Sequence, residues 1–142
     1  MRTIEIVQGV VFRRSSGKVE FLVVKRVPSD GGFWQAVTGT IESGEDPLTT
    51  LKRELKEEAG LSYLLHVSEM LHTYEWVSDE HGVSGKDSVF TVEVPYDSEV
   101  VLEPSEHDDY KWLPLEEATR MLKYDGNKLS MRKAAEYAEQ LI

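Results

Sequence analysis

The chain has 142 residues, 40% of them hydrophobic and 30% charged, and this composition is typical of one globular domain over residues 1–142. Its formal net charge of −10 argues against nonspecific nucleic-acid binding, because Lys and Arg supply that affinity. Without cysteine there is no disulfide framework and no thiolate zinc site, and no apolar run reaches the roughly 20 residues of a membrane span. The N-terminal residues lack the apolar core of a signal peptide, so we expect a cytoplasmic protein, monomeric or homodimeric, that binds neither nucleic acid nor membrane.

The first half of the chain predicts three strands and one helix. Residues 3–13 and 19–27 are rich in Val, Ile and Phe, and a Ser-Ser-Gly turn separates them. Residues 33–39 predict a short strand that ends at a glycine, and residues 40–46 a polar loop. Asp46 is a typical N-cap, Pro47 suits the first helical position and Gly60 suits the end, so a helix is expected between them.

The second half predicts further strands and two helices. Strands are expected at 65–77 and 88–95, with the polar loop 78–88 between them, and shorter strands at 99–102 and 110–112. Helices are expected at 114–123 and 129–142. Because strands and helices do not alternate regularly, the predicted fold class is mixed α/β rather than a repeated βαβ ladder.

The stretch RELKEEAG, residues 53–60, places three glutamates on the first helix. Glu54 and Glu58 are four residues apart and Glu57 lies about a quarter-turn away, so all three can point toward one small volume. A stripe of leucines marks the expected buried face: Leu48, Leu51 and Leu55. Clustered carboxylates suit a hard divalent cation, although the same pattern is common on solvated helices, where the like charges merely repel.

The residues before this helix favour the metal site. From Gly39, five residues precede Glu45 and seven more precede the run Arg53-Glu54-Leu-Lys-Glu-Glu-Ala-Gly-Leu, which ends at residue 61. This spacing resembles the Nudix hydrolase signature at every specified position. The resemblance implies an α/β/α sandwich with a central mixed β-sheet, and hydrolysis of a nucleoside diphosphate linked to another group. It also implies Mg²⁺ or Mn²⁺ as cofactor.

The same resemblance implies roles for individual residues. The metal ligands would be Gly39, through its carbonyl, and Glu54, Glu57 and Glu58. Arg53 matches the arginine that orients carboxylates, and Glu45 matches a supporting glutamate. A polyphosphate and an acidic pocket tolerate each other only with cations between them, and a carboxylate must then take a proton from the attacking water. The family uses no fixed base, so Glu54 and a residue outside the motif both remain candidates.

Two segments outside the metal motif bear on the substrate. Residues 33–40, FWQAVTGT, resemble the bacterial dihydroneopterin triphosphate and dATP pyrophosphohydrolases. The bis-nucleosyl tetraphosphatase branch tends to have Pro-Lys-Gly where this chain has Val-Thr-Gly. Residues 106–118, EHDDYKWLPLEEA, resemble both branches. By that match Glu106 is an additional metal ligand or the general base, and His107 has a supporting or structural role.

Four residues are candidates for contact with the substrate. Trp34 could stack on a base or pterin ring, although aromatic residues more often belong to the core. Gln35 follows it and could point the opposite way. Lys25 and Arg26 end a strand with side chains on alternate faces, so one of them could meet phosphate.

These observations predict a Mg²⁺-dependent hydrolase with Glu54, Glu57, Glu106 and Arg53 in its catalytic site. It would cleave a small nucleoside or pterin triphosphate to the monophosphate and pyrophosphate. An asymmetrical diadenosine tetraphosphate hydrolase is the alternative enzyme. Two further alternatives are a non-catalytic nucleotide-binding Nudix module, which the complete set of motif carboxylates disfavours, and an acidic metal-binding helix without chemistry.

Overall fold

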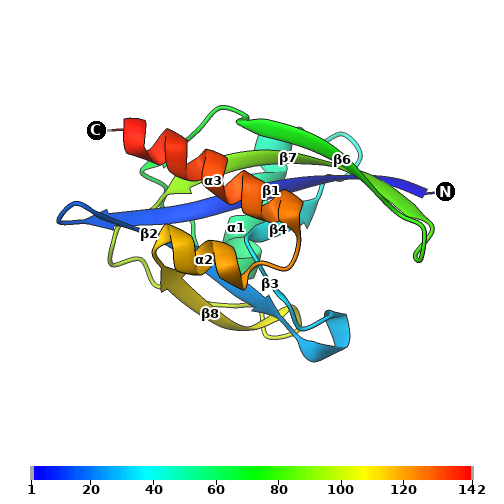
Figure 1. Cartoon of the computed structure of the whole chain (residues 1–142), viewed down its shortest axis with the longest axis horizontal. Helices are drawn as coiled ribbons and strands as arrows, with labels where there is room; N and C mark the ends of the chain where they lie inside the picture. Colours follow the sequence, from blue (N-terminus) through cyan, green and yellow to red (C-terminus); the bar gives the residue numbers. More distant parts are fainter. Residues whose placement is uncertain (1, 142) are drawn as a thin grey trace.

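The computed structural model describes residues 2–141 and shows a sheet with helices on both faces (Figure 1). Its strands are β1 (Arg2–Ser15), β2 (Lys18–Arg26), β3 (Trp34–Gln35), β4 (Val37–Thr40), β5 (His66–Val67), β6 (His72–Ser78), β7 (Val83–Glu93) and β8 (His107–Leu113). Its helices are the short 3₁₀ turn η1 (Pro28–Asp30), α1 (Pro47–Ala59), α2 (Leu115–Met121) and α3 (Asp125–Gln140). None of these helices is both long and apolar enough to cross a membrane.

The sheet is mixed, as predicted. The hydrogen-bonded path runs β3-β2-β1-β7-β5, while β4 pairs with β1, β6 with β7, and β8 with β2. β1 and β7 are parallel over their whole pairing, and the other strand pairs are antiparallel. With 14 residues, β1 is long enough to pair with β4 in its first half and with β2 in its second half.

Strand alternation divides the interior into two apolar layers. Residues on one face of the sheet pack with Leu51, Leu55 and Ala59 of α1. Residues on the other face pack with α2 and α3, including Ala118 and Met131. Figure 1 shows α2 and α3 together on one side of the sheet and α1 behind it. This arrangement is the predicted α/β/α sandwich.

Two predicted strands are each broken in two. The strand expected at 33–39 divides into β3, which pairs with β2, and β4, which pairs with β1. The strand expected at 65–77 divides into β5 and β6, which both pair with β7. Between them Ser68 caps the interruption, since its hydroxyl accepts from the Thr91 N–H at 2.9 Å.

Other sequence-based boundaries also need correction. The polar loop expected at 78–88 is mostly strand: β6 and β7 form a hairpin whose turn occupies only residues 79–82. The strand expected at 99–102 is absent, because this segment bonds to the end of α1, with the Val101 N–H donating to the Ala59 carbonyl. Strand β8 is longer than 110–112, α2 is shorter than 114–123, and α3 starts at Asp125 rather than 129. Leu48 is 38% exposed, so it does not belong to the buried stripe.

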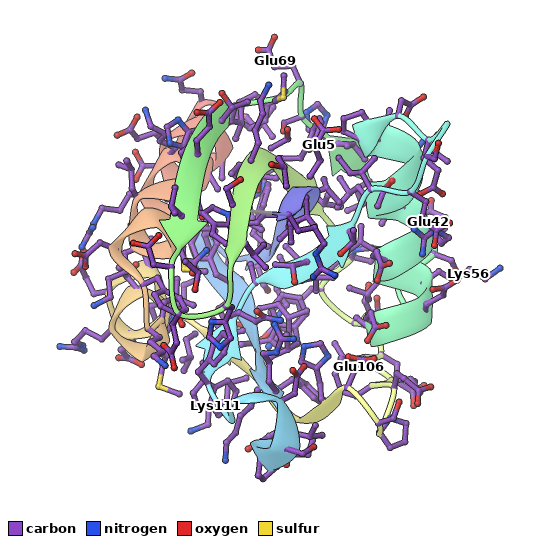
Figure 2. All side chains as sticks on the ribbon, turned by 90° about the vertical axis from the view of Figure 1, so that its right-hand side faces the viewer. Glu5, Glu42, Lys56, Glu69, Glu106 and Lys111 are labelled. Atoms are coloured by element: carbon purple, nitrogen blue, oxygen red, sulfur yellow. The ribbon has the colours of Figure 1, made fainter. Side chains whose placement is uncertain are left out.

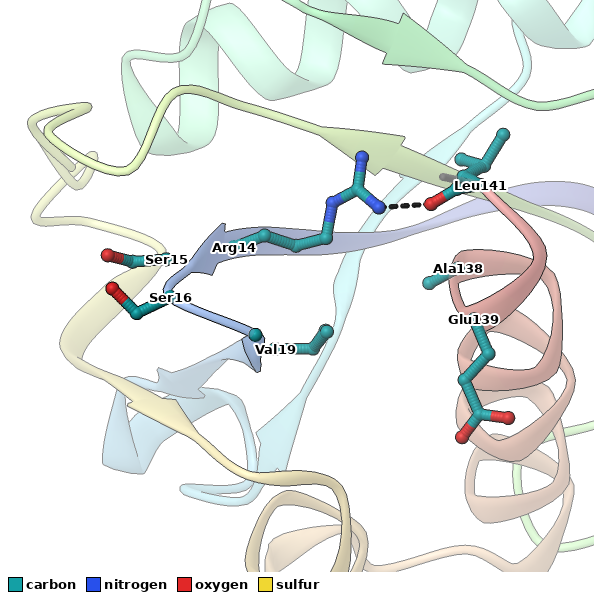
Figure 3. Close-up of a pocket in the computed structure, with 8 residues that line it drawn as sticks. Arg14, Ser15, Ser16, Val19, Ala138, Glu139 and Leu141 are labelled. Carbon is teal, nitrogen blue, oxygen red and sulfur yellow. Dashed lines mark hydrogen bonds between the residues drawn. The ribbon is translucent and has the colours of Figure 1, made fainter.

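The C-terminal end of α3 is tied to the sheet by Arg14. Its guanidinium donates to the Leu141 carbonyl (Figure 3) and pairs with both Glu93 carboxylate oxygens, at 2.9 and 3.1 Å. A pocket opens here between the β1–β2 turn and α3. None of the motif glutamates lines it, so it is separate from the site described next.

Candidate active site

Helix α1 carries the three motif glutamates and begins and ends where its capping residues predict. Asp46 accepts a hydrogen bond from the Thr49 N–H at 2.8 Å, and Pro47 occupies the first helical position. Gly60 ends the helix at a φ of +68°, a left-handed conformation that favours glycine. The buried face is formed by Thr50, Leu51, Leu55 and Ala59. Burial of this face fixes the rotation of the helix and therefore the direction of its acidic edge.

The glutamates of α1 converge. Ligand oxygens of Glu54, Glu57 and Glu58 all lie within 4.8 Å of one another. Glu57 is exposed, whereas Glu54 and Glu58 are half-buried. Three carboxylates this close, with one of them open to solvent, match the donor chemistry of Mg²⁺ or Mn²⁺ and leave room for water or phosphate oxygens.

Strand β4 brings Gly39 directly against this cluster. A Cβ atom at position 39 would lie 2.5 Å from Cδ of Glu54, so a side chain there would displace the carboxylate. The need for glycine comes from this close approach and not from an unusual backbone angle. The Gly39 backbone therefore lies beside Glu54.

Arg53 and Glu45 form a rigid support next to the cluster. The Arg53 guanidinium donates to both Glu45 oxygens, at 3.0 and 3.1 Å, and to Glu54 at 2.8 Å. Glu45 also accepts from the Thr50 hydroxyl at 2.9 Å. These hydrogen bonds, that from Arg53 first, lower the pKa of Glu45 to about 2. Arg53 thereby fixes Glu54 in orientation while its own charge is shared among several carboxylates.

A fourth carboxylate, Glu106, approaches from outside the motif. Its segment follows the end of α1, because the Glu103 N–H donates to the Glu58 carbonyl at 3.3 Å. The Glu106 carbonyl in turn accepts from the Val27 N–H at 3.1 Å. Figure 2 shows Glu106 beside the lower end of α1. Glu103, which the sequence analysis did not single out, belongs to the same acidic surroundings, and its spacing three residues before Glu106 was the only available signal.

The electrostatics of the cluster are unfavourable for the protein alone. Burial, followed by the charges of Glu106, Glu54 and Glu103, raises the pKa of Glu58 to about 7. Burial also raises the pKa of Glu54, and Arg53 offsets part of that effect. Like charges held together in this way are relieved by a bound cation, so the residues present fit a divalent metal.

His107 and Gln35 lie behind Glu58. His107 is only 5% exposed, and its Nδ1 lies 3.6 Å from Glu58 Oε2. Its Nε2 lies 3.2 Å from the side-chain nitrogen of the buried Gln35. Burial, and secondly the charge of Arg26, lower the pKa of His107. These contacts involve the residue that the sequence predicts as supporting or structural, and its partners are distant in the chain.

The predicted substrate-contact residues divide between the two faces of the sheet. Arg26 lies on the α1 side, where it donates to the side-chain oxygen of Gln35 at 3.4 Å and pairs with Asp30. Trp34 packs against the layer beneath α2 and α3, with Lys111 Nζ 5.5 Å from its ring centre. Lys25 pairs with Trp34 across the strands, so its side chain leaves the same face as Trp34. The structure therefore brings Arg26 and Gln35 toward the carboxylates, and not Trp34 or Lys25.

Comparison with known proteins identifies the family. A family profile described as NUDIX domain matches residues 4–134. The chain therefore belongs to the Nudix hydrolase family, as its motif predicted. A dihydroneopterin triphosphate diphosphatase from Haemophilus influenzae is 31% identical over 135 residues, which cover 87% of this chain and 82% of that protein.

The chain is also similar to part of a longer protein and to a solved structure. An octanoyltransferase from Myxococcus xanthus is 33% identical over 134 residues, covering 94% of this chain but only 36% of that protein, so the chain spans about a third of this relative. Among solved structures, an Ap4A hydrolase from C. elegans superposes with a TM-score of 0.84 and 25% identity, covering 96% of this chain and 98% of that one.

Proposed function

We propose that this chain hydrolyses a nucleoside triphosphate or a pterin triphosphate to the monophosphate and pyrophosphate, with Mg²⁺ or Mn²⁺ as cofactor. The observation that carries the proposal is the convergence of the three α1 glutamates, with Glu106 contributing to the same field. The similarity to a dihydroneopterin triphosphate diphosphatase supports the triphosphate substrate.

Each acidic residue has a distinct task in this proposal. Glu54, Glu57, Glu58 and Glu106, together with the carbonyl of Gly39, hold the metal. When bound, the ion neutralises phosphate charge and acidifies the attacking water. Glu54 or Glu106 accepts the proton from that water. Burial raises the pKa of Glu54 and so makes it a stronger base than an ordinary glutamate. Arg53 keeps Glu54 in place throughout.

Substrate contacts complete the proposal. Arg26 is the cation best placed to meet a phosphate group, because it lies on the same face as the carboxylates and is partly exposed. Lys25 and Trp34, which lie toward the opposite face, are proposed to contact a more distant part of the substrate such as the ring. Gln35 holds the side chains of Arg26 and His107 in place through its hydrogen bonds to both.

An asymmetrical dinucleoside tetraphosphate hydrolase is the second candidate. The high TM-score to the C. elegans Ap4A hydrolase favours it, because that match extends over nearly the whole of both chains. The two activities share one metal site and differ in the loops around it, so the acidic cluster alone does not discriminate between them.

A substrate panel tests the proposal. Deoxy and ordinary nucleoside triphosphates, dihydroneopterin triphosphate, diadenosine tetraphosphate, ADP-ribose and a nucleotide sugar are incubated with Mg²⁺ at alkaline pH, and the products are separated by chromatography. Pyrophosphate plus a monophosphate from a triphosphate is the expected result. ATP plus AMP from diadenosine tetraphosphate, with triphosphates untouched, assigns the second candidate. Nucleotide binding without any turnover contradicts both and indicates a non-catalytic module.

A further inference from the structure

Two buried side-chain polar atoms in residues 2–141 lack a hydrogen-bond partner, and they face each other. They are Oε2 of Glu58 and Nδ1 of His107, 3.6 Å apart. Buried polar atoms are almost always paired, so an unpaired couple requires an explanation. Because the distance is slightly longer than a hydrogen bond, a small rotation of the Glu58 carboxylate would join the two atoms.

The surroundings of His107 determine which of its ring nitrogens carries the proton. The Arg26 guanidinium can only donate, so the Gln35 carbonyl oxygen faces it and the Gln35 amide nitrogen faces His107. That amide N–H donates to Nε2 of His107, which must then be unprotonated. In a neutral ring the proton is therefore on Nδ1, and the Nδ1–H points at Glu58.

The backbone of His107 is held firmly enough for this side chain to act as a fixed donor. Its N–H donates to the Glu103 carbonyl at 3.0 Å, and His107 pairs with Arg26 between β8 and β2. Asp30 holds Arg26 from the other side. The chain of contacts therefore runs from the η1 turn through Arg26, Gln35 and His107 to the α1 carboxylate.

We propose that His107 is a positioning residue that holds the Glu58 carboxylate in its metal-binding orientation through the Nδ1–H, with Gln35 fixing the required tautomer. This inference rests on the proposed function only in taking Glu58 as a metal ligand. With one Glu58 oxygen held by His107, the other is left for the metal. A neutral donor is suited to this role, because it orients the carboxylate without competing with the cation for charge.

Mn²⁺ titration of the metal-free protein, followed by electron paramagnetic resonance without substrate, tests the proposal. Two polar replacements form a matched pair. His107→Asn places an amide N–H near the position of Nδ1, whereas His107→Gln places it near Nε2 and leaves nothing facing Glu58. His81→Asn is the control, since His81 lies in the β6–β7 turn and contacts Ser78. We expect His107→Gln to weaken Mn²⁺ binding by about 10- to 100-fold and His107→Asn to retain most of it.

The tautomer is measured separately on the unmodified protein. Long-range ¹H–¹⁵N spectra should show His107 with protonated Nδ1 and bare Nε2, and Gln35→Leu should make the two forms mix. Equal Mn²⁺ affinity of folded His107→Gln and the parent, or a proton on Nε2 in the parent, overturns the proposal. If the variants fail to fold, the parent spectrum decides. A parent that binds no Mn²⁺ contradicts the proposed function instead, while the spectrum still tests the contact.

Discussion

Each face of the sheet contains buried carboxylates, but the carboxylates on the two faces differ in their hydrogen-bond partners. Beneath α3, the Asp87 carboxylate accepts hydrogen bonds from Trp76 at 2.7 Å, Gln8 at 2.6 Å and Tyr74 at 3.2 Å. Asn127 adds a bond to the Tyr74 hydroxyl. Every partner is neutral, and together they satisfy both carboxylate oxygens.

The glutamates on α1 lack a comparable set of hydrogen-bond donors. Glu58 keeps a buried oxygen without a partner, and its nearest charges are other carboxylates that raise its pKa. Within residues 2–141, Arg53 is the one cation that bonds to the motif glutamates. A buried carboxylate surrounded by donors is structural, whereas carboxylates that face one another are stabilised by a bound cation.

The largest expected effect comes from breaking the incomplete cluster. Glu57→Gln removes a carboxylate that is exposed and outside the core, so the fold should persist while turnover falls by about 10²-fold or more. Steady-state kinetics with Mg²⁺ on the substrate found by the panel measures it. Glu136→Gln is the matched control, because Glu136 is also exposed on a helix and lies on α3. A folded Glu57→Gln enzyme as active as the control would remove Glu57 from the metal site.

The sequence predicted one of these two groups and not the other, for a physical reason. The acidic cluster is built mainly on one helix, so helical spacing and the Gly39–Glu54 separation in the motif are visible as a linear pattern. The Asp87 network joins β1, β6, β7 and α3, and no local pattern relates those elements. The contact of His107 with Glu58 likewise depends on how β8 passes the end of α1.

The same limit explains the errors in strand boundaries. Period-two alternation detects extended chain but not a change of partner, so 33–39 was expected as one strand although β3 and β4 bond to different neighbours. The turn and the first half of β7, within residues 78–88, are expected as a loop for a related reason. Their polar residues, among them Asp87, are satisfied by cross-strand contacts that sequence alone does not reveal.

Opposite effects on stability should separate the two groups. Without metal at pH 8, Asp87→Asn places an amide N–H against existing donors and should lower the free energy of unfolding by about 1–3 kcal/mol. Glu58→Gln removes a partly buried charge that faces other carboxylates and should raise the free energy of unfolding by about 1–2 kcal/mol, allowing for partial solvent screening. Urea unfolding in the presence of a chelator measures both.

The two substitutions also serve as controls for each other. Asp87→Asn should leave Mn²⁺ affinity unchanged, because Asp87 lies with the α3 layer on the opposite face, whereas Glu58→Gln should weaken it. If Glu58→Gln destabilises the metal-free protein as much as Asp87→Asn does, the α1 cluster is a completed structural network and the contrast between the faces is wrong.

The smallest effect is a pH dependence confined to the metal-free protein. The pKa of Glu58 is raised from 4.5 to about 7 in the folded state, so this group stabilises the fold at low pH and loses that contribution as pH rises through 7. His107 has the opposite effect, since its lowered pKa reduces the stability of the fold only below pH 6.5. The pKa of Glu45 is about 2, so Glu45 does not titrate in this range. Between pH 6.5 and 8 we therefore expect the Tm of metal-free protein to fall by a few degrees, and Glu58→Gln to remove most of that slope.

Mg²⁺ should reverse the trend, because it binds the deprotonated carboxylates and its stabilisation grows as pH rises. Differential scanning calorimetry across this range, with and without chelator, measures both slopes, and a parent slope equal to that of Glu58→Gln would assign the titration to another group.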